Sequence, residues 1–396
     1  MKIALLGYGT VGRGVDEIIS TRVSEVEVAR ILELPDRLSD PRMTSSIDDI
    51  LRDESIELVV ECMGGLEPAR TYIMGALEAG KHVVTSNKAV VAANFARFAA
   101  AAASTGAGLY IEASVGGGIP WIASIEKVRR IDEVSSFSGI MNGTTNYIVD
   151  AMRHAGEDFG EVLARAQGLG YAERDPSADI DGVDVLNKTI ITASVAFDVA
   201  CEKNLPTSGI RNLCATDLAL FAEHGRTVKL LGRGVRSEGR YAAAVEPVAV
   251  AADSLEANVP SNFNLVTLDA TTVGELKFYG QGAGSLPTGN AIVQDVLDCA
   301  RGVRRPVYDF SCPLDYDPSL LRGDYVFRTE ARLGDAEPFG EGAVLVRDLT
   351  AEGARALLDE ALAADPTTFM AALARGGEAG GAVDPASLSP DPAQEG

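Results

Sequence analysis

Five carboxylates lie within the twelve residues from 173 to 184, and a lysine follows them. Asp184 and Lys188 stand at positions i and i+4, so they share one face of the helix that begins there. A carboxylate cluster could bind the ammonium of an amino-acid substrate, and a lysine beside a carbonyl can donate a proton as hydride arrives. Without EF-hand spacing or a histidine, a metal site is disfavoured. A surface acidic loop with one ion pair is the alternative.

A second lysine lies in a position suited to ligand binding. Lys88 follows the predicted strand 82–85 and directly precedes the predicted helix 89–104. Because α/β proteins bind ligands at the carboxyl ends of parallel strands, Lys88 could meet a nicotinamide ribose or an anionic substrate. A solvated lysine that caps the strand is the alternative.

The N-terminus contains a glycine pattern typical of dinucleotide binding. Gly7, Gly9 and Gly12 form a Gly-x-Gly-x-x-Gly turn between an apolar strand and a helix. Gly7 permits the tight turn, Gly9 lets the backbone approach a pyrophosphate, and Gly12 lets helix and strand pack closely. The N–H groups at the helix start, where Thr10 and Val11 lie, would bind the phosphates. An ordinary glycine-rich turn is the alternative.

The residues at and just after the end of the second predicted strand do not decide which nucleotide binds. Glu33 could bind a ribose diol and favour NAD, Asp36 lies nearby, and Arg37 could accept a 2′-phosphate and favour NADP. The sequence therefore predicts NAD or NADP without choosing between them.

Two further glycine-rich loops could approach the same site. Three glycines at 116–118 expose carbonyl groups that could ligate a hard cation, or they could form a hinge between domains. The turn at 279–288 precedes a helix late in the chain, which indicates that the chain returns to the nucleotide site.

Alternating strands and helices predict a Rossmann-type, doubly wound parallel sheet over 1–131, to which 285–315 returns. Its strands are expected at 2–6, 25–33, 58–62, 82–85 and 108–113, and its helices at 11–20, 47–52, 68–79 and 89–104. An α+β domain for substrate binding, catalysis and dimerisation follows at 132–284. Its strands are expected at 134–141, 229–235, 241–250, 264–272 and 275–280, and its helices at 145–155, 159–169, 184–197 and 213–223. A short C-terminal extension covers 325–396, and we expect disorder beyond Arg375 because that end is rich in Gly, Ala and Pro.

Composition restricts the possible partners of the 396-residue chain. A net charge of −22 disfavours nucleic acid and anionic lipid, and no apolar stretch reaches membrane-spanning length. The five cysteines include no CxxC pair, which indicates a reduced cytoplasmic protein. Only eight of the 35 basic residues are lysine, which fits either salt adaptation or a GC-rich genome. Neither a Gly-x-Ser-x-Gly elbow nor an HExxH motif is present, so a hydrolase is not supported.

In this order, these motifs resemble homoserine dehydrogenase, over about residues 1–310. The most specific part is the block 170–188, which resembles the family signature along its length. Its matching residues are Gly170, Tyr171, Ala172, Glu173, Asp175, Pro176, Asp179, Ile180, Gly182, Asp184 and Lys188. The segment 138–148, SGIMNGTTNYI, is similar to a second family segment.

The resemblance implies reversible, NAD(P)H-dependent reduction of L-aspartate 4-semialdehyde to L-homoserine, on the route to threonine, isoleucine and methionine. Lys188 resembles the proton donor to the carbonyl, and Lys88 resembles a second active-site lysine. Glu173 and Asp184 fall where the family binds its substrate, with Asp179 as a further candidate.

The resemblance also places the cofactor and an ion. Gly170 and the turn at 280–284, with Gly282, fall at cofactor contacts. A sodium or potassium ion would be held largely through backbone oxygens of Glu112, Val115, Gly117 and Ile119. Members of the family form dimers or tetramers, so a homodimer or homotetramer is expected.

Two alternatives remain: a related Rossmann dehydrogenase that acts on another amino acid, and a non-catalytic NAD(P)-binding sensor. Many bacterial family members also carry a regulatory ACT domain after about residue 330. Here the predicted strands 325–333 and 343–348 have no helix of the usual kind between them. We therefore expect no threonine feedback through an ACT domain.

Overall fold

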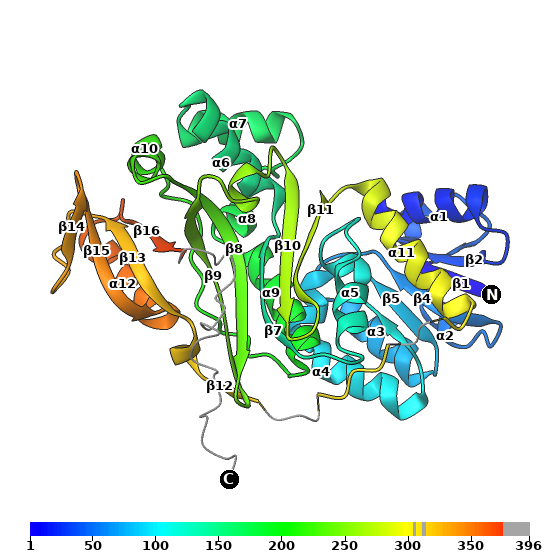
Figure 1. Cartoon of the computed structure of the whole chain (residues 1–396). Helices are drawn as coiled ribbons and strands as arrows, with labels where there is room; N and C mark the ends of the chain where they lie inside the picture. The colour runs from blue at the N-terminus through cyan, green and yellow to red at the C-terminus, as the bar shows by residue number, and fades with distance from the viewer. Residues whose placement is uncertain (304–305, 311–313, 375–396) are drawn as a thin grey trace, which may run out of the picture.

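Two β-sheets organise the part of the chain that the computed structural model describes, residues 1–303, 306–310 and 314–374. One sheet has six strands and the other has ten, and the two lie side by side with helices between them (Figure 1). None of the described helices is long and apolar enough to cross a membrane.

The six-stranded sheet has the strand order β3-β2-β1-β4-β5-β6, and every neighbouring pair is parallel. Its strands are β1 (Lys2–Leu6), β2 (Glu27–Leu32), β3 (Met43–Thr44), β4 (Ile56–Glu61), β5 (His82–Thr85) and β6 (Leu109–Tyr110). The residues from Ile3 to Leu6 are fully buried, as expected for a parallel strand that helices cover on both faces. This order confirms the predicted Rossmann-type sheet.

Helices from both ends of the sequence cover this sheet. They are α1 (Thr10–Arg22), α2 (Asp48–Leu51), α3 (Ala69–Glu78), α4 (Lys88–Thr105) and α11 (Ser285–Ala300). Helix α11 packs beside α1, and the Ser285 hydroxyl donates a hydrogen bond to the carbonyl of Thr10 at 3.0 Å (Figure 1). The late part of the chain therefore returns to the first glycine turn.

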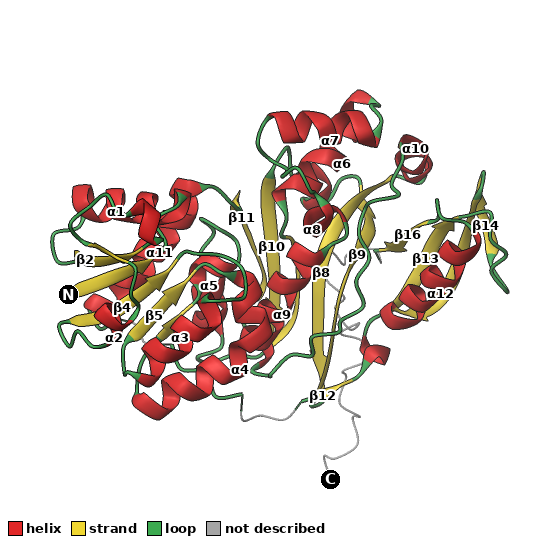
Figure 2. Ribbon diagram, turned by 180° about the vertical axis from the view of Figure 1, so that it is seen from behind, coloured by secondary structure: helices red, strands yellow, loops and turns green. Residues whose placement is uncertain are grey.

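The ten-stranded sheet has the order β11-β10-β7-β8-β9-β16-β13-β15-β14, with β12 paired to β9. Its central strands are β7 (Val134–Ile140), β8 (Arg226–Ser237), β9 (Arg240–Ala251), β10 (Phe263–Ala270) and β11 (Gly274–Gln281), and β12 is Asp315–Tyr316. The helices of this part are α5 (Trp121–Val128), α6 (Gly143–Ala155), α7 (Phe159–Gly168), α8 (Ser177–Ile180), α9 (Val183–Phe197) and α10 (Ala215–Glu223). Figure 2 shows α9 between this sheet and α4 of the parallel sheet.

The C-terminal segment extends the same sheet instead of forming a detached unit. It comprises β13 (Arg322–Arg328), β14 (Glu337–Gly340), β15 (Ala343–Thr350), α12 (Ala351–Ala364) and β16 (Phe369–Leu373). Strand β16 pairs in parallel with β9, where Ala372 faces Val248. No helix lies between β13 and β15, as predicted, but the short strand β14 does. The predicted disorder beyond Arg375 falls outside the described residues.

Two predicted strands are wrong in extent, since the strand predicted over 325–333 is β13, Arg322–Arg328, and ends five residues earlier. The sequence suggested a strand over 108–113, but β6 contains only Leu109–Tyr110, and Glu112–Ser114 forms a 3-10 turn. The chain turns because the Glu112 N–H donates to the Asp295 carboxylate at 3.0 Å. The Glu112 carboxylate in turn accepts hydrogen bonds from the N–H groups of Ile122 and Ala123, at the start of α5. Helix α5 itself was not predicted.

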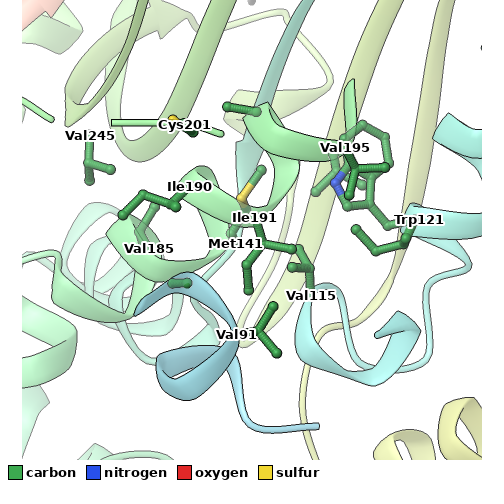
Figure 3. Close-up of a cluster of buried hydrophobic side chains, with 14 of the residues drawn as sticks. Val91, Val115, Trp121, Met141, Val185, Ile190, Ile191, Val195, Cys201 and Val245 are labelled. Carbon is green, nitrogen blue, oxygen red and sulfur yellow. The ribbon is translucent and has the colours of Figure 1, made fainter. Parts of the chain in front are cut away.

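An apolar cluster joins the two sheets (Figure 3). Val91 of α4 lies opposite α9, which contributes Val185 and Ile191, and Met141 and Val115 lie beside them. All five side chains are fully buried. Because close-packed side chains permit little displacement, this cluster fixes the polar N-terminal ends of α4 and α9 relative to each other.

Candidate active site

The first residues of α4 and α9 bring two lysines onto one carboxylate. Asp184 Oδ2 lies 2.8 Å from Lys188 Nζ, one turn along α9, and Asp184 Oδ1 lies 2.8 Å from Lys88 Nζ, at the start of α4. The backbone carbonyl of Met141 also accepts from Lys188 Nζ, at 2.6 Å. Residues predicted separately, 96 to 100 positions apart, therefore form one ion-paired group.

Burial differs sharply between the two lysines. The Lys88 side chain is 41% exposed, whereas those of Lys188 and Asp184 are 9% and 8% exposed. The surface-loop alternative is therefore wrong for Asp184 and Lys188. Lys88 forms the solvent-facing side of the group, and Lys188 forms its buried side.

This difference in burial sets the direction of each pKa. Burial lowers the pKa of the Lys188 ammonium below 10.5, and Asp184 opposes that shift. The charge of Asp184 raises the pKa of Lys88. Burial alone would raise the pKa of the Asp184 carboxyl, but the charges of Lys188 and Lys88 outweigh it and hold that pKa below its usual range. Asp184 therefore stays ionised, while Lys188 can lose its proton more easily than an ordinary lysine.

Asn142, which was not among the predicted site residues, holds two of the carboxylates in place. Its Nδ2 donates to Asp179 Oδ1 at 2.6 Å and to Asp184 Oδ2 at 2.8 Å. Its Oδ1 accepts from the N–H of Thr145 at 2.8 Å and so caps α6. An asparagine between a predicted strand and a predicted helix was the signal for the cap, but no local pattern indicates the contact with the carboxylates.

The remaining predicted substrate residues lie at different distances from this group. Asp179 in α8 is partly buried, and burial, with the nearby charge of Asp184, raises its pKa. Glu173 is exposed in the loop before α8, and its negative charge contributes to the raised pKa of Lys88. Gly170 lies in the same loop with φ +76°, a left-handed conformation that glycine adopts readily. The structure therefore brings Asp179 and Asp184 together and leaves Glu173 at the rim.

The first glycine turn has the geometry that its spacing predicts. Gly7 has φ +93°, and its N–H donates to the carbonyl of Leu32 at the end of β2. A Cβ atom on Gly12 would lie 2.3 Å from the Gly7 carbonyl oxygen, so only glycine fits there. A cavity of about 410 Å³ opens beside the turn, with Gly9 and Glu33 in its lining. The turn, the cavity and the start of α1, with Thr10 and Val11, suit a nucleotide pyrophosphate.

The two later glycine loops contact each other. A Cβ on Gly117 would lie 2.5 Å from the carbonyl carbon of Gly282, and one on Gly282 would lie 1.9 Å from Asn264 Nδ2. Within the described residues, no hydrogen bond reaches the carbonyls of Val115 and Gly117, whereas those of Glu112 and Ile119 each accept one from a backbone N–H. The loop therefore offers two carbonyl oxygens, those of Val115 and Gly117, that accept no hydrogen bond within the described residues, and backbone oxygens of this kind can ligate a hard cation.

The glycine turn gives a prediction about cofactor affinity. Gly9 has no atom within 4 Å of an added Cβ, so Gly9→Ala should fold normally, with only a small loss of helix capping. The methyl group would occupy the approach to the pyrophosphate, and we expect the Kd for NAD(P)H to rise at least about tenfold. Gly160→Ala, equally unobstructed in α7, is the matched control. An unchanged Kd, measured by fluorescence titration, would contradict this assignment.

Comparisons with known proteins agree with one family. A sequence profile for "Homoserine dehydrogenase, NAD binding domain" matches residues 7–112, and one for "Homoserine dehydrogenase" matches residues 120–297. The homoserine dehydrogenase of Synechocystis sp. is 41% identical over 321 residues, which cover 75% of this chain and 73% of that protein.

Solved structures agree as well. A crystal structure of a homoserine dehydrogenase from Thiobacillus denitrificans has a TM-score of 0.81 and 30% identity, covering 94% of this chain and 98% of that one. A hyperthermophilic archaeal homoserine dehydrogenase in complex with NADPH has a TM-score of 0.66 and 23% identity, covering 77% and 98%. From its motifs, its two-sheet architecture and these relatives, the chain belongs to the homoserine dehydrogenase family of NAD(P)-dependent oxidoreductases acting on a CH–OH group.

Proposed function

We propose that Lys188 is the proton donor in the reduction of L-aspartate 4-semialdehyde to L-homoserine. The observation that carries this proposal is the contact of Asp184 with both lysines, at 2.8 Å each. A protonated lysine has three N–H donors, and two of those on Lys188 are directed to Asp184 and to the Met141 carbonyl. The third remains for the aldehyde oxygen. When bound, NAD(P)H supplies the hydride to the aldehyde carbon.

The surrounding charges make this proton transfer favourable. Asp184 keeps Lys188 positioned and favours its charged form, while burial makes its proton easier to release. A fixed ammonium beside the carbonyl oxygen also stabilises the negative charge that develops there as the carbonyl is reduced. Lys88, more exposed and firmly protonated, would contact both substrate and cofactor at the mouth of the site.

The carboxylates would bind the amino-acid part of the substrate. Asp184 and Asp179 both accept hydrogen bonds from Asn142 Nδ2, and the exposed Glu173 adds negative charge at the edge of the group. The ammonium of L-homoserine is attracted to such a cluster, because each carboxylate oxygen can accept more than one hydrogen bond.

The glycine loops would bind the nucleotide and the ion. The proposed nucleotide contacts are Gly7, Gly9, Thr10, Val11, Gly12, Lys88, Gly170 and Gly282. An archaeal relative with the same fold binds NADPH, which supports a nicotinamide dinucleotide here. Backbone oxygens of Glu112, Val115, Gly117 and Ile119 would hold a sodium or potassium ion. The charge of that ion would stabilise the contact between the loops that contain Gly117 and Gly282.

One assay tests the activity. Purified protein is mixed with L-homoserine and either NAD⁺ or NADP⁺, at low and at high salt, and reduced cofactor is followed by absorbance. We expect turnover with at least one cofactor and none with L-aspartate. If neither cofactor supports turnover at low or at high salt, the proposed substrate is contradicted. The salt series also separates a salt-adapted surface from one that merely reflects Arg-for-Lys usage.

The C-terminal segment gives a prediction about regulation. Between β13 and β15 the described chain has only turns and the short strand β14, so the first helix of an ACT domain is missing. We therefore expect L-threonine to leave the initial rate within about twofold across a millimolar titration, since a lost regulatory site removes the coupling free energy that inhibition needs. Strong inhibition by threonine would contradict this prediction.

A further inference from the structure

Glu33 is held rigidly at the edge of the nucleotide cavity. It follows the last residue of β2, and its Oε2 accepts a hydrogen bond from the N–H of Tyr8 at 3.1 Å. Its Oε1 accepts from the N–H of Leu34 at 2.9 Å. Tyr8 belongs to the first glycine turn, so this carboxylate is attached to the same turn that receives the pyrophosphate.

The position of Glu33 corresponds to the ribose of a bound dinucleotide. In Rossmann sheets the adenosine ribose lies at the carboxyl end of the second strand, beside the glycine turn. The cavity of about 410 Å³ is lined here by Gly7, Gly9, Glu33 and Arg37. Each carboxylate oxygen accepts one backbone hydrogen bond and keeps a second lone pair, which could accept from a ribose hydroxyl.

The two nearby arginines, Arg37 and Arg42, are not held in place against the Glu33 carboxylate. Arg37 ends the short 3-10 turn Pro35–Arg37, and its exposed guanidinium makes no hydrogen bond or ion pair within the described residues. Arg42 is already neutralised, because Asp16 and Asp40 each lie 2.9 Å from its guanidinium. The anchored charge at the ribose position is therefore negative.

We propose that Glu33 makes the protein selective for NAD(H) over NADP(H). The carboxylate accepts hydrogen bonds from the 2′-hydroxyl of NAD(H), whereas the 2′-phosphate of NADP(H) would meet a fixed like charge that cannot turn away. Specificity then comes as much from repulsion of one nucleotide as from attraction of the other. This inference rests on the proposed binding of a nicotinamide dinucleotide at the first glycine turn.

The test measures binding of NADH and NADPH directly, without substrate, by fluorescence titration of the full chain. We expect the wild-type protein to bind NADH at least about 100-fold more tightly than NADPH. Glu33→Gln keeps the side-chain shape and removes the charge, so it should reduce that ratio at least about tenfold, mainly through tighter NADPH binding. Glu57→Gln, the same change at an exposed residue of β4 outside the cavity lining, should leave the Kd for each nucleotide within about twofold.

The outcomes separate this inference from the function on which it rests. Equal or tighter binding of NADPH by the wild-type protein would overturn the inference, as would an unchanged ratio in Glu33→Gln. If neither nucleotide binds, the proposed cofactor site is itself wrong, and the inference fails with it. The wild-type ratio needs no variant, so it remains decisive even if Glu33→Gln does not fold.

Discussion

Replacing Lys188 by alanine is expected to lower kcat for reduction by roughly 10²- to 10⁴-fold, the range that general acid catalysis supplies. The Kd for NAD(P)H should change by less than about twofold, because Lys188 lies on α9, away from the first glycine turn. Stopped-flow turnover and fluorescence titration measure the two quantities separately.

Two controls make the Lys188 result specific. Lys127→Ala removes an exposed lysine of α5 and should leave kcat unchanged. Lys188→Arg keeps a positive charge but holds its proton far more tightly, so it should recover little of the rate. Near-normal kcat in Lys188→Ala would rule out the proposed role.

Replacing Asp184 by asparagine is expected to have the second largest effect. The change leaves the ammonium groups of Lys188 and Lys88 facing each other without the carboxylate that now contacts both. Loss of that charge should lower the pKa of Lys188 further, so that less of it is protonated near pH 7. We expect kcat for reduction to fall by roughly 10- to 100-fold, with the decline of rate at high pH moved to lower pH.

Asp179→Asn is the matched control for Asp184→Asn. Asp179 also accepts a hydrogen bond from Asn142, but no ion pair joins it to a lysine within the described residues. Its replacement should therefore raise KM for the amino-acid substrate and shift the pH profile of kcat less than Asp184→Asn does, because the charge of Asp179 contributes less to the pKa of Lys188. Equal shifts of the pH profile in both variants would show that Asp184 has no special effect on Lys188.

Local sequence patterns predicted the parts of the site that a short segment determines. The turn from Gly7 to Gly12 and the pairing of Asp184 with Lys188 each follow from the spacing within one helix or one strand-turn-helix unit. The alternation of strands and helices likewise predicted the parallel sheet. The turn and the Asp184–Lys188 pair each lie within one short segment, whereas the sheet follows from the order of the elements along the chain.

Contacts between distant segments could not be predicted in this way. Lys88 meets Asp184 only because the apolar cluster fixes α4 against α9, and no spacing encodes that packing. The same holds for Asn142, which reaches Asp179 across 37 residues, and for the pairing of β16 with β9. The prediction of a strand over 108–113 was wrong because the N–H of Glu112 donates a hydrogen bond to Asp295, which is distant in the sequence.

Several expectations from the sequence stay predictions. They are the domain boundaries at 131, 284 and 325, assembly into a homodimer or homotetramer, and a cytoplasmic location.

The segment from β13 to β16 continues the central sheet through β9. We therefore expect removal of the residues after 321 to expose the edge of β9 and to promote aggregation.

The pH dependence of the initial rate in both directions tests the role of Lys188 most directly. Burial lowers the pKa of this lysine below 10.5, and the reduction needs its protonated form. kcat/KM for the aldehyde should therefore be highest at low pH and fall as the pH rises through the lowered pKa. kcat/KM for L-homoserine, which needs the neutral amine as a base, should rise through the same pKa. Profiles that change in the same direction, or that remain in Lys188→Ala, would contradict the account.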